Sequence, residues 1–282
     1  MSVNDTAIAW TNVTWNPATG CEKISEGCKF CYAEQLAEQK RGTAAFPTGF
    51  DLKLRPHKLS DPKRLKEPSL IFVNSMSDLF WDQITDAYRD LVLDTIEATP
   101  QHQYQVLTKR PENMLRYSKR RKLPPNFWAG STIENQRWFD KRMPLLLQVD
   151  AEIRFVSAEP LIGAIRGDWS GIHWVITGGE SGNHIARGQN ADRALVCRVD
   201  GKWVPTPERE DWVRKIRDDV KLVGGSLFHK QWGGPRPDSG GRMLDGRTWD
   251  EFPRLPKGGG VNYRLEKKST TLGLVFAPGS RD

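Results

Sequence analysis

Short runs of apolar residues alternate with longer amphipathic segments up to about residue 230 of the chain. The apolar runs are rich in β-branched and aromatic residues and are bounded by Pro, Gly, Ser or Asp, which is typical of strands buried on both faces. These predicted strands lie at residues 12–15, 70–74, 104–108, 127–131, 153–157, 174–177 and 227–231. Helical periodicity separates them at residues 32–39, 86–98, 111–118, 136–148 and 208–223.

A repeated strand–helix–strand order predicts an α/β fold with a parallel sheet. About seven strands favour an incomplete (β/α) TIM-like barrel over residues 1–231, and a doubly wound open sheet is the alternative. The pattern stops after residue 231, where Gly and Pro become frequent. We therefore expect residues 232–282 to form an irregular Gly/Pro-rich extension that packs on the barrel through Trp232 and Trp249. In either architecture, ligands bind at the carboxyl ends of the strands.

The amino-acid composition indicates what class of protein this is and what class of partner it would bind. Of the 282 residues, 38% are hydrophobic and 27% are charged, and no apolar run is long enough to span a membrane. The N-terminus carries no apolar signal segment, so we expect a cytoplasmic protein without a membrane partner. Lys and Arg number 42 against 35 Asp and Glu, which favours a polyanion such as nucleic acid.

Part of this positive charge is concentrated in residues 101–125. Only one acidic residue, Glu112, lies in that segment. Such a cluster is typical of either a phosphate-binding surface or an ordinary solvated helix face. The basic residues are Lys109, Arg110, Arg116, Lys119, Arg120, Arg121 and Lys122.

Three of the four cysteines, Cys21, Cys28 and Cys31, lie within eleven residues at the start of the first predicted barrel unit. Three thiolates can hold a cubane iron–sulfur cluster and leave its fourth iron for a non-protein ligand. A tetrahedral zinc site is the alternative, and it needs one more protein ligand. The candidates for that fourth ligand are His57, His102 and Cys197, the last of which is otherwise explained as a partly buried thiol.

Phe30 directly precedes Cys31, and this Cys-x-aromatic-Cys arrangement resembles the cluster-binding loop of radical S-adenosylmethionine (SAM) enzymes. Those enzymes usually have three residues between the first two cysteines, whereas this chain has six. The chain also resembles a phage-associated family of unassigned function that shares the longer gap. The matching motifs lie at residues 14–21, 28–34, 157–160, 178–181 and 230–234. The radical SAM resemblance implies that the three cysteines bind a [4Fe-4S] cluster and that SAM chelates the fourth iron.

Polar residues follow the second predicted strand as Ser75, Ser77 and Asp78. The pattern resembles that of the spore photoproduct lyase branch of radical SAM enzymes, in which this strand end faces the amino and carboxylate groups of SAM. The resemblance implies a cofactor-binding role for the three residues. The alternative is an ordinary helix cap.

Later strand ends carry further candidates. Lys109 and Arg110 lie beside a predicted helix start and are candidates for binding an anion, either the SAM carboxylate or a substrate phosphate, and surface charges flanking a turn are the alternative. Ser131 and Thr132 are expected to contact SAM or to cap a helix. Glu159 and Glu180 each follow a strand and are candidates for substrate binding or acid–base catalysis. A turn with an ion-paired glutamate is the alternative for both.

These features lead to one principal hypothesis. We expect a radical SAM enzyme that cleaves SAM, releases a 5′-deoxyadenosyl radical, takes its electron from an external donor and acts on DNA, tRNA or one of their bases. A non-enzymatic, zinc-stabilised nucleic-acid-binding protein is the alternative, and modification of a partner protein is a third possibility. The sequence leaves the substrate, the reductant and the oligomeric state open.

Overall fold

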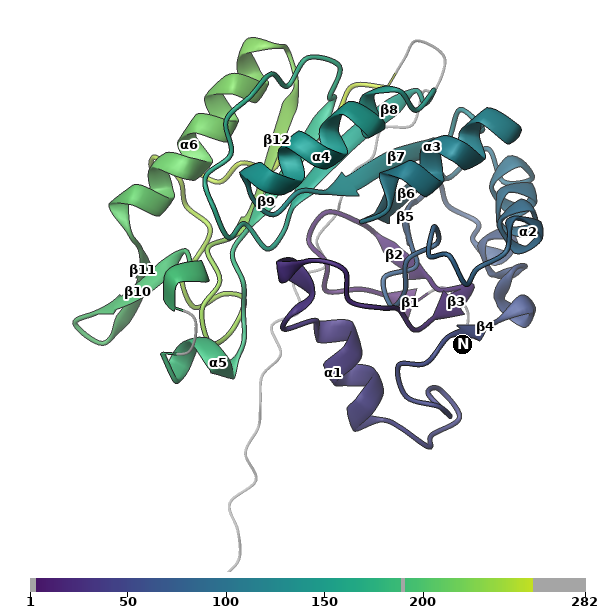
Figure 1. Ribbon diagram of the computed structural model, residues 1–282, viewed down its shortest axis with the longest axis horizontal. Coiled ribbons are helices and arrows are strands. Elements are labelled where there is room, and N and C mark those ends of the chain that lie inside the picture. Colours follow the sequence, from purple (N-terminus) through teal and green to yellow (C-terminus); the bar gives the residue numbers. More distant parts are fainter. Residues whose placement is uncertain (1–3, 189–190, 256–282) are drawn as a thin grey trace, which may run out of the picture.

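The computed structural model describes residues 4–188 and 191–255. Its main sheet has eight strands in the order β1-β2-β5-β6-β7-β8-β9-β12, of which seven are parallel and β1 is antiparallel. The sheet curls into a half-barrel (Figure 1). The strands are β1 (Asn4–Asp5), β2 (Val13–Trp15), β5 (Leu70–Val73), β6 (Gln103–Thr108), β7 (Phe127–Thr132), β8 (Ile153–Ala158), β9 (Trp174–Gly178) and β12 (Ser226–Gln231).

The parallel strands follow one another in chain order without a reversal, and a doubly wound sheet would require such a reversal. The incomplete TIM-like barrel is therefore confirmed. All seven predicted strands form, each within one residue of its predicted bounds.

Helices α2, α3, α4 and α6 lie along the outer face of the sheet, and α1 lies apart from them (Figure 1). Side chains of Thr85, Asn135 and Thr206 cap the amino ends of α2, α4 and α6, and α3 and α6 begin with proline. The predicted helices are thus confirmed to within two residues at each end. They are α1 (Tyr32–Gln39), α2 (Asp86–Glu97), α3 (Pro111–Arg120), α4 (Gln136–Leu147) and α6 (Pro207–Leu222).

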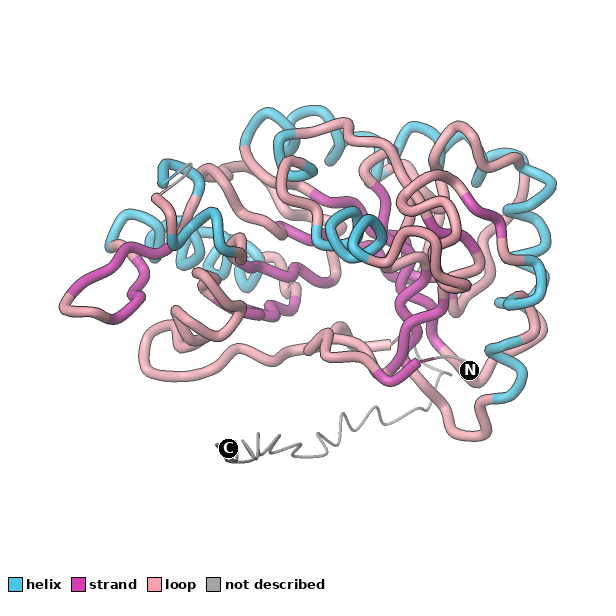
Figure 2. The backbone as a smooth tube through the Cα atoms, turned by 90° about the horizontal axis from the view of Figure 1, so that it is seen from below, coloured by secondary structure: helices cyan, strands magenta, loops and turns pink. Residues whose placement is uncertain are grey.

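Several small elements were not predicted, because each is too short to show a period. A β-hairpin of β10 and β11 projects from one end of the molecule (Figures 1 and 2). Its turn places Asp200 and Gly201 at positive φ. The unpredicted elements, including the two strands of this hairpin, are β3 (Ala18–Thr19), β4 (Lys53–Leu54), β10 (Val196–Val199), β11 (Lys202–Pro205), α5 (Asn183–Ala186) and the 3₁₀ turns Glu26–Cys28, Pro56–Lys58, Asp61–Arg64 and Ala191–Arg193.

Both faces of the sheet are buried, as the continuous apolar strands require. Alternate residues point to opposite sides, so Val175 packs in the larger core while Trp174 and Ile176 pack in a second, aromatic cluster. Trp10 from the N-terminal segment and Phe252 from the C-terminal segment contact this second cluster.

The described part of the C-terminal extension packs along β12. The indole nitrogen of Trp174 donates to the carbonyl of Glu251, and the Glu251 carboxylate accepts from the amide of Leu227. Trp232 is buried, and Trp249 packs against the larger core. Residues 256–282 of the extension lie outside the described residues, and the division at residue 231 stays a prediction.

No described helix combines the length and the apolar character needed to cross a bilayer.

The carboxyl half of β12 carries a fully buried imidazole. The Nδ1 atom of His229 lies 2.9 Å from the hydroxyl of Thr177 on β9, and its ring packs against Trp232. Within the described residues, its Nε2 atom has no hydrogen-bond partner. Burial, reinforced by the charge of Arg242, lowers the pKa of His229 to about 3.

We predict that His229 makes the fold sensitive to acid. Because the pKa is lower in the folded protein than in the unfolded chain, folding releases protons, and stability is lost as the pH falls below about 6.5 towards 3. The H229Q variant should therefore lose less unfolding free energy than the wild type between about pH 7 and about pH 4, measured by urea denaturation. An equal loss in both proteins would contradict the prediction.

Candidate functional site

The cysteine segment (residues 21–31) links β3 to α1 at the carboxyl end of β2. Its three cysteines are free thiols of intermediate exposure. Cys28 ends a 3₁₀ turn, and Cys31 is the N-cap of α1. The segment begins at Gly20, whose φ of 92° and close approach to the Asp51 carbonyl exclude a side chain.

A buried ion pair between Asp78 and Arg110 lies next to Cys21. The Asp78 carboxylate accepts hydrogen bonds from the Thr108 hydroxyl at 2.7 Å and from the amides of Phe80 and Lys109 at 3.0 Å. It also accepts from Nη1 of Arg110 at 3.3 Å, and the same nitrogen lies 4.0 Å from Sγ of Cys21. The oxygens of Asp78 are therefore engaged within the protein, and Asp78 orients Arg110 towards the first cysteine.

The thiols of Cys21 and Cys28 differ electrostatically. Burial, together with the charge of Asp78, raises the pKa of Cys21 to about 11, against the opposing effect of Arg110 and Lys109. Burial also opposes ionisation of Cys28, but the charge of Lys109 and hydrogen bonds within the segment, including one to Ser25, lower its pKa overall. Lys109 thus acts on both thiols through its charge.

The strand end of β7 contacts the cysteine segment through Glu134. This side chain is fully buried, accepts a short hydrogen bond from the Ser25 hydroxyl, and pairs with Arg142 at 2.8 Å. A Cβ at Gly27 would lie 2.6 Å from the Glu134 side chain, so the segment passes directly over it. The sequence analysis assigned no role to Glu134, because no local pattern indicates that it contacts Ser25, which lies 109 positions earlier in the chain.

The two candidates predicted at the end of β7, Ser131 and Thr132, lie close to the contact between Glu134 and Ser25. The Ser131 hydroxyl donates to the carbonyl of Thr108 at 3.1 Å, which ties β7 to β6. Thr132 is buried at the strand end, and its carbonyl accepts from Arg142. The Ser131 hydroxyl is therefore engaged as a donor within the sheet, and the cofactor-binding roles expected for Ser131 and Thr132 stay predictions.

Glu180 supports the cysteine segment from the β9 side. Its carboxylate pairs with Arg193 at 2.7 Å and lies 3.3 Å from Nε2 of His184. The His184 ring stacks on Phe30, with ring centroids 3.7 Å apart and planes 7° apart. Glu180 is thus held in an ion-paired cluster, and this cluster positions the aromatic residue between the last two cysteines.

Glu159 has a different environment inside the half-barrel. It pairs with Lys230 of β12 at 3.0 Å and accepts from the indole nitrogen of Trp10 at 3.2 Å. The hydroxyl of Ser157 lies 3.5 Å away. The Glu159 side chain keeps 15% of its surface exposed, so solvent or a ligand can reach it.

The serines after β5 lie next to the cysteine segment. The Ser75 hydroxyl exchanges hydrogen bonds with Asn16, and its carbonyl accepts from the hydroxyl of Tyr32 at 2.7 Å. Ser77 pairs with Gly20 in a parallel bridge. Its buried hydroxyl has no hydrogen-bond partner among the described residues.

Much of the basic segment is neutralised within the protein. Arg116 and Arg120 pair with Asp86 of α2, and Arg121 pairs with several carboxylates of the same helix. These arginines therefore hold α3 to α2. For this part of the basic segment, the pairing favours an ordinary helix face over a phosphate-binding surface.

A depression of about 500 Å³ opens beside the cysteine segment and gathers basic side chains from the end of β6 and from α4. It also contains carboxylates, Glu112 among them. Its walls include Glu22 and Ile24 of the segment, Lys109 and Arg110 after β6, and Lys141 and Arg142 of α4.

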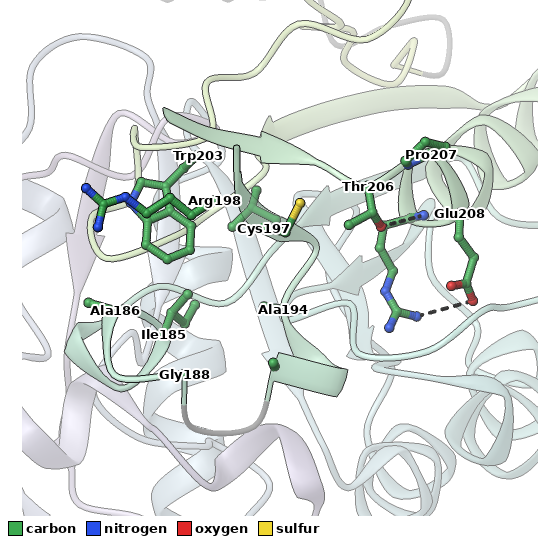
Figure 3. A pocket seen from close by; sticks show the side chains of 13 residues that line it. Ile185, Ala186, Gly188, Ala194, Cys197, Arg198, Trp203, Thr206, Pro207 and Glu208 are labelled. Atoms are coloured by element: carbon green, nitrogen blue, oxygen red, sulfur yellow. Dashed lines mark hydrogen bonds and ion pairs between the residues drawn. The ribbon is translucent and has the colours of Figure 1, made fainter. Parts of the chain in front are cut away.

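The proposed fourth zinc ligands do not join the cysteine segment. Cys197 faces a separate depression of about 480 Å³ between α5 and the β10–β11 hairpin (Figure 3). His102 is buried, with its Nε2 atom 3.2 Å from the carbonyl of Pro62, and His57 lies in an exposed turn. In the described part of the chain, no three His, Cys, Asp or Glu side chains converge on a position for one metal ion.

Comparisons with known proteins extend these observations. A family model described as "Protein of unknown function (DUF5131)" matches residues 5–198. No curated protein sequence matches the chain.

Solved structures of spore photoproduct lyase share the fold. A cysteine-to-serine mutant is 13% identical over 81% of this chain and 78% of that chain, with a TM-score of 0.53. A double mutant with bound AdoMet and dinucleoside spore photoproduct is 14% identical over 80% and 78%, with a TM-score of 0.51. The lyase complexed with dinucleoside spore photoproduct is 11% identical over the same shares, also with a TM-score of 0.51. At these identities the likeness establishes the fold, and the chemistry has to be argued from the residues.

We predict that His184 keeps the cysteine segment ordered. The H184A variant removes the ring that stacks on Phe30, so amide hydrogen exchange across residues 22–30 should become faster while exchange in the barrel strands stays unchanged. The H57A variant is the matched control, because His57 is exposed and lies in a different turn. Equal protection of the segment in all three proteins would show that the stacking does not hold it.

Proposed function

The chain belongs to the DUF5131 family of proteins of unknown function, and we propose that it is a radical SAM enzyme acting on a nucleic acid. One observation carries the proposal. Three free cysteines lie on one segment at the carboxyl end of β2 in a parallel half-barrel, and a buried arginine faces the first of them. Spore photoproduct lyase, a radical SAM enzyme, has the same fold.

The residues at the segment fit a [4Fe-4S] cluster better than a zinc ion. Each thiolate of a cubane site binds a different iron, so the sulfurs need not converge on one point as the ligands of a tetrahedral zinc do. The Nη2 atom of Arg110 is a buried donor without a hydrogen-bond partner in the described part of the chain, and cluster sulfur is an acceptor of the right kind. In this proposal Cys21, Cys28 and Cys31 hold the three irons.

When bound, the cluster would pass one electron to the sulfonium of SAM, and cleavage of a carbon–sulfur bond would release a 5′-deoxyadenosyl radical. The unpartnered hydroxyl of Ser77 supports a role in binding a polar group of SAM, as does its contact with Gly20. Ser75 and Thr132 lie at neighbouring strand ends, and we propose the same role for them. Asp78 and Ser131 act as positioning residues, since their side chains are already bonded.

For the substrate end of the site, we propose Glu159 as the acid–base candidate. It lies inside the half-barrel, is partly exposed and is held by Lys230. Glu180 is assigned to positioning of Phe30, because its carboxylate is occupied by Arg193 and His184.

A nucleic acid is the substrate class that we propose. The chain carries a net charge of +7, and the neighbouring lyase structures contain a dinucleoside spore photoproduct. Lys109 and Lys141 remain beside the cysteine segment after the arginines of α3 have paired with α2. We also propose a reducing cytoplasm and an external electron donor, which agree with cysteines that are unpaired thiols.

We predict that the cysteine trio determines both cluster content and SAM cleavage. After anaerobic reconstitution, the wild type should hold about four irons and four sulfides and absorb visible light. With SAM and dithionite it should form 5′-deoxyadenosine, detected by mass spectrometry. The C21S, C28S and C31S variants should each lose cluster and activity, because each removes the ligand of one iron.

C197S is the matched control and should keep both, since Cys197 lines a different depression. A colourless wild type with one tightly bound zinc would refute the enzyme and leave the zinc-stabilised binding protein. An intact cluster that never cleaves SAM would refute the radical SAM assignment alone.

We predict that nucleic acid binds partly through Lys141. The affinity for a single-stranded oligonucleotide should fall as salt rises, and K141Q should reduce the slope of log K against log salt by about 0.7, the value for one phosphate contact. R120Q is the control, because Arg120 is paired with carboxylates of α2. Affinity that is independent of salt would exclude phosphate contacts and favour a protein substrate.

A further inference from the structure

Arg110 brings a positive charge to Cys21 and is itself buried. Only 3% of its surface is exposed, and its Nη1 atom lies 4.0 Å from Sγ of Cys21. Its Nη2 atom also forms an ion pair with Glu22 and its Nε atom one with Asp82, both with exposed carboxylates at 3.8 Å, which is beyond hydrogen-bond distance. Leaving a donor such as Nη2 buried and unpartnered is costly. The surroundings of Arg110 therefore call for an acceptor on the side of the cysteine segment.

The position of this guanidinium is fixed by the fold. The backbone amide of Arg110 donates to the Thr108 hydroxyl at 2.9 Å, and α3 begins at the next residue. Asp78 binds Nη1 and is itself held by Thr108 and by backbone amides of both strand ends. The pair is thus held rigidly, with Nη1 of the guanidinium 4.0 Å from Sγ of Cys21.

The other cations near the segment differ from Arg110 in their contacts. Arg142 is equally buried, but its Nη1 atom binds Glu134 at 2.8 Å and the carbonyl of Thr132, and no described contact joins it to a cysteine sulfur. Lys109 is only partly buried, so solvent screens its charge. Among these three cations in the described part of the chain, Arg110 is the one that contacts a cysteine sulfur directly, through Nη1.

We propose that Arg110 sets the reduction potential of the cluster held by the cysteine segment. This inference rests on the proposed function. Reduction adds one electron to the cluster and so increases its negative charge, and the potential of such a cluster depends on net charge, burial and hydrogen bonds to its sulfurs. A fixed cationic donor beside Cys21 stabilises the reduced state more than the oxidised state, because Coulomb energies are large where water is excluded. Arg110 is a positioning residue in this role, since it acts through the cluster.

The test is a potentiometric titration of the reconstituted cluster, followed by electron paramagnetic resonance. R110M should shift the midpoint potential to more negative values by about 60 mV, a tenfold change in a one-electron equilibrium, and R110K should restore part of the shift. R116M is the matched control, because Arg116 also lies on α3 but pairs with Asp86 on an exposed face. Its potential should equal that of the wild type.

R110M leaves Asp78 buried without its cationic partner, so the D78N/R110M double variant removes both charges and guards against a folding defect. Its potential should also fall, because the N–H donor to sulfur is gone. Full iron content with an unchanged potential in both variants would overturn this inference and leave the proposed function intact. A wild type that binds zinc in place of a cluster would overturn both.

Discussion

The buried Asp78–Arg110 ion pair is the contact on which the candidate site depends. Burying a single charge is expensive, and the pair is tolerated because the hydrogen bonds of Asp78 satisfy both carboxylate oxygens. Those bonds join the ends of β5 and β6 and leave the guanidinium facing Cys21. A charge pair inside the scaffold thereby determines the environment of a thiol on a loop.

The cysteine segment is held at two further places by side chains from two other strand ends and from the helices that follow them. On one side, Ser25 bonds to Glu134, and Glu26 accepts from the indole of Trp138 at 2.6 Å. On the other side, Phe30 stacks on His184, which Glu180 supports. Preorganisation of this kind is what a multi-iron ligand set needs, since ligands on a loose loop bind less tightly than ligands held in place. The six-residue gap after Cys21 supplies Ser25 and Glu26, so the longer loop has an identifiable structural use.

The polar strand ends divide into residues that hold the scaffold and residues that are left for a ligand. Asp78, Ser131 and Glu180 belong to the first group, because their polar atoms are bonded within the chain. Ser77 and Glu159 keep either an unpartnered atom or an exposed surface. The same division applies to the basic segment, in which the arginines of α3 neutralise α2. Net charge and residue type alone would have assigned all of them to binding.

The sequence by itself determined the main strands and helices, favoured the barrel over a doubly wound sheet, and placed the cysteines at the start of the first barrel unit. These features follow from periodicity, capping residues and spacing, which act over a few residues and can be read locally. Tertiary structure alone decided which polar side chains meet. Arg110 reaches a sulfur 89 positions away, and Glu134 reaches a hydroxyl 109 positions away. Such contacts depend on how strand ends converge after the sheet has curled, and no local pattern of residues contains that information.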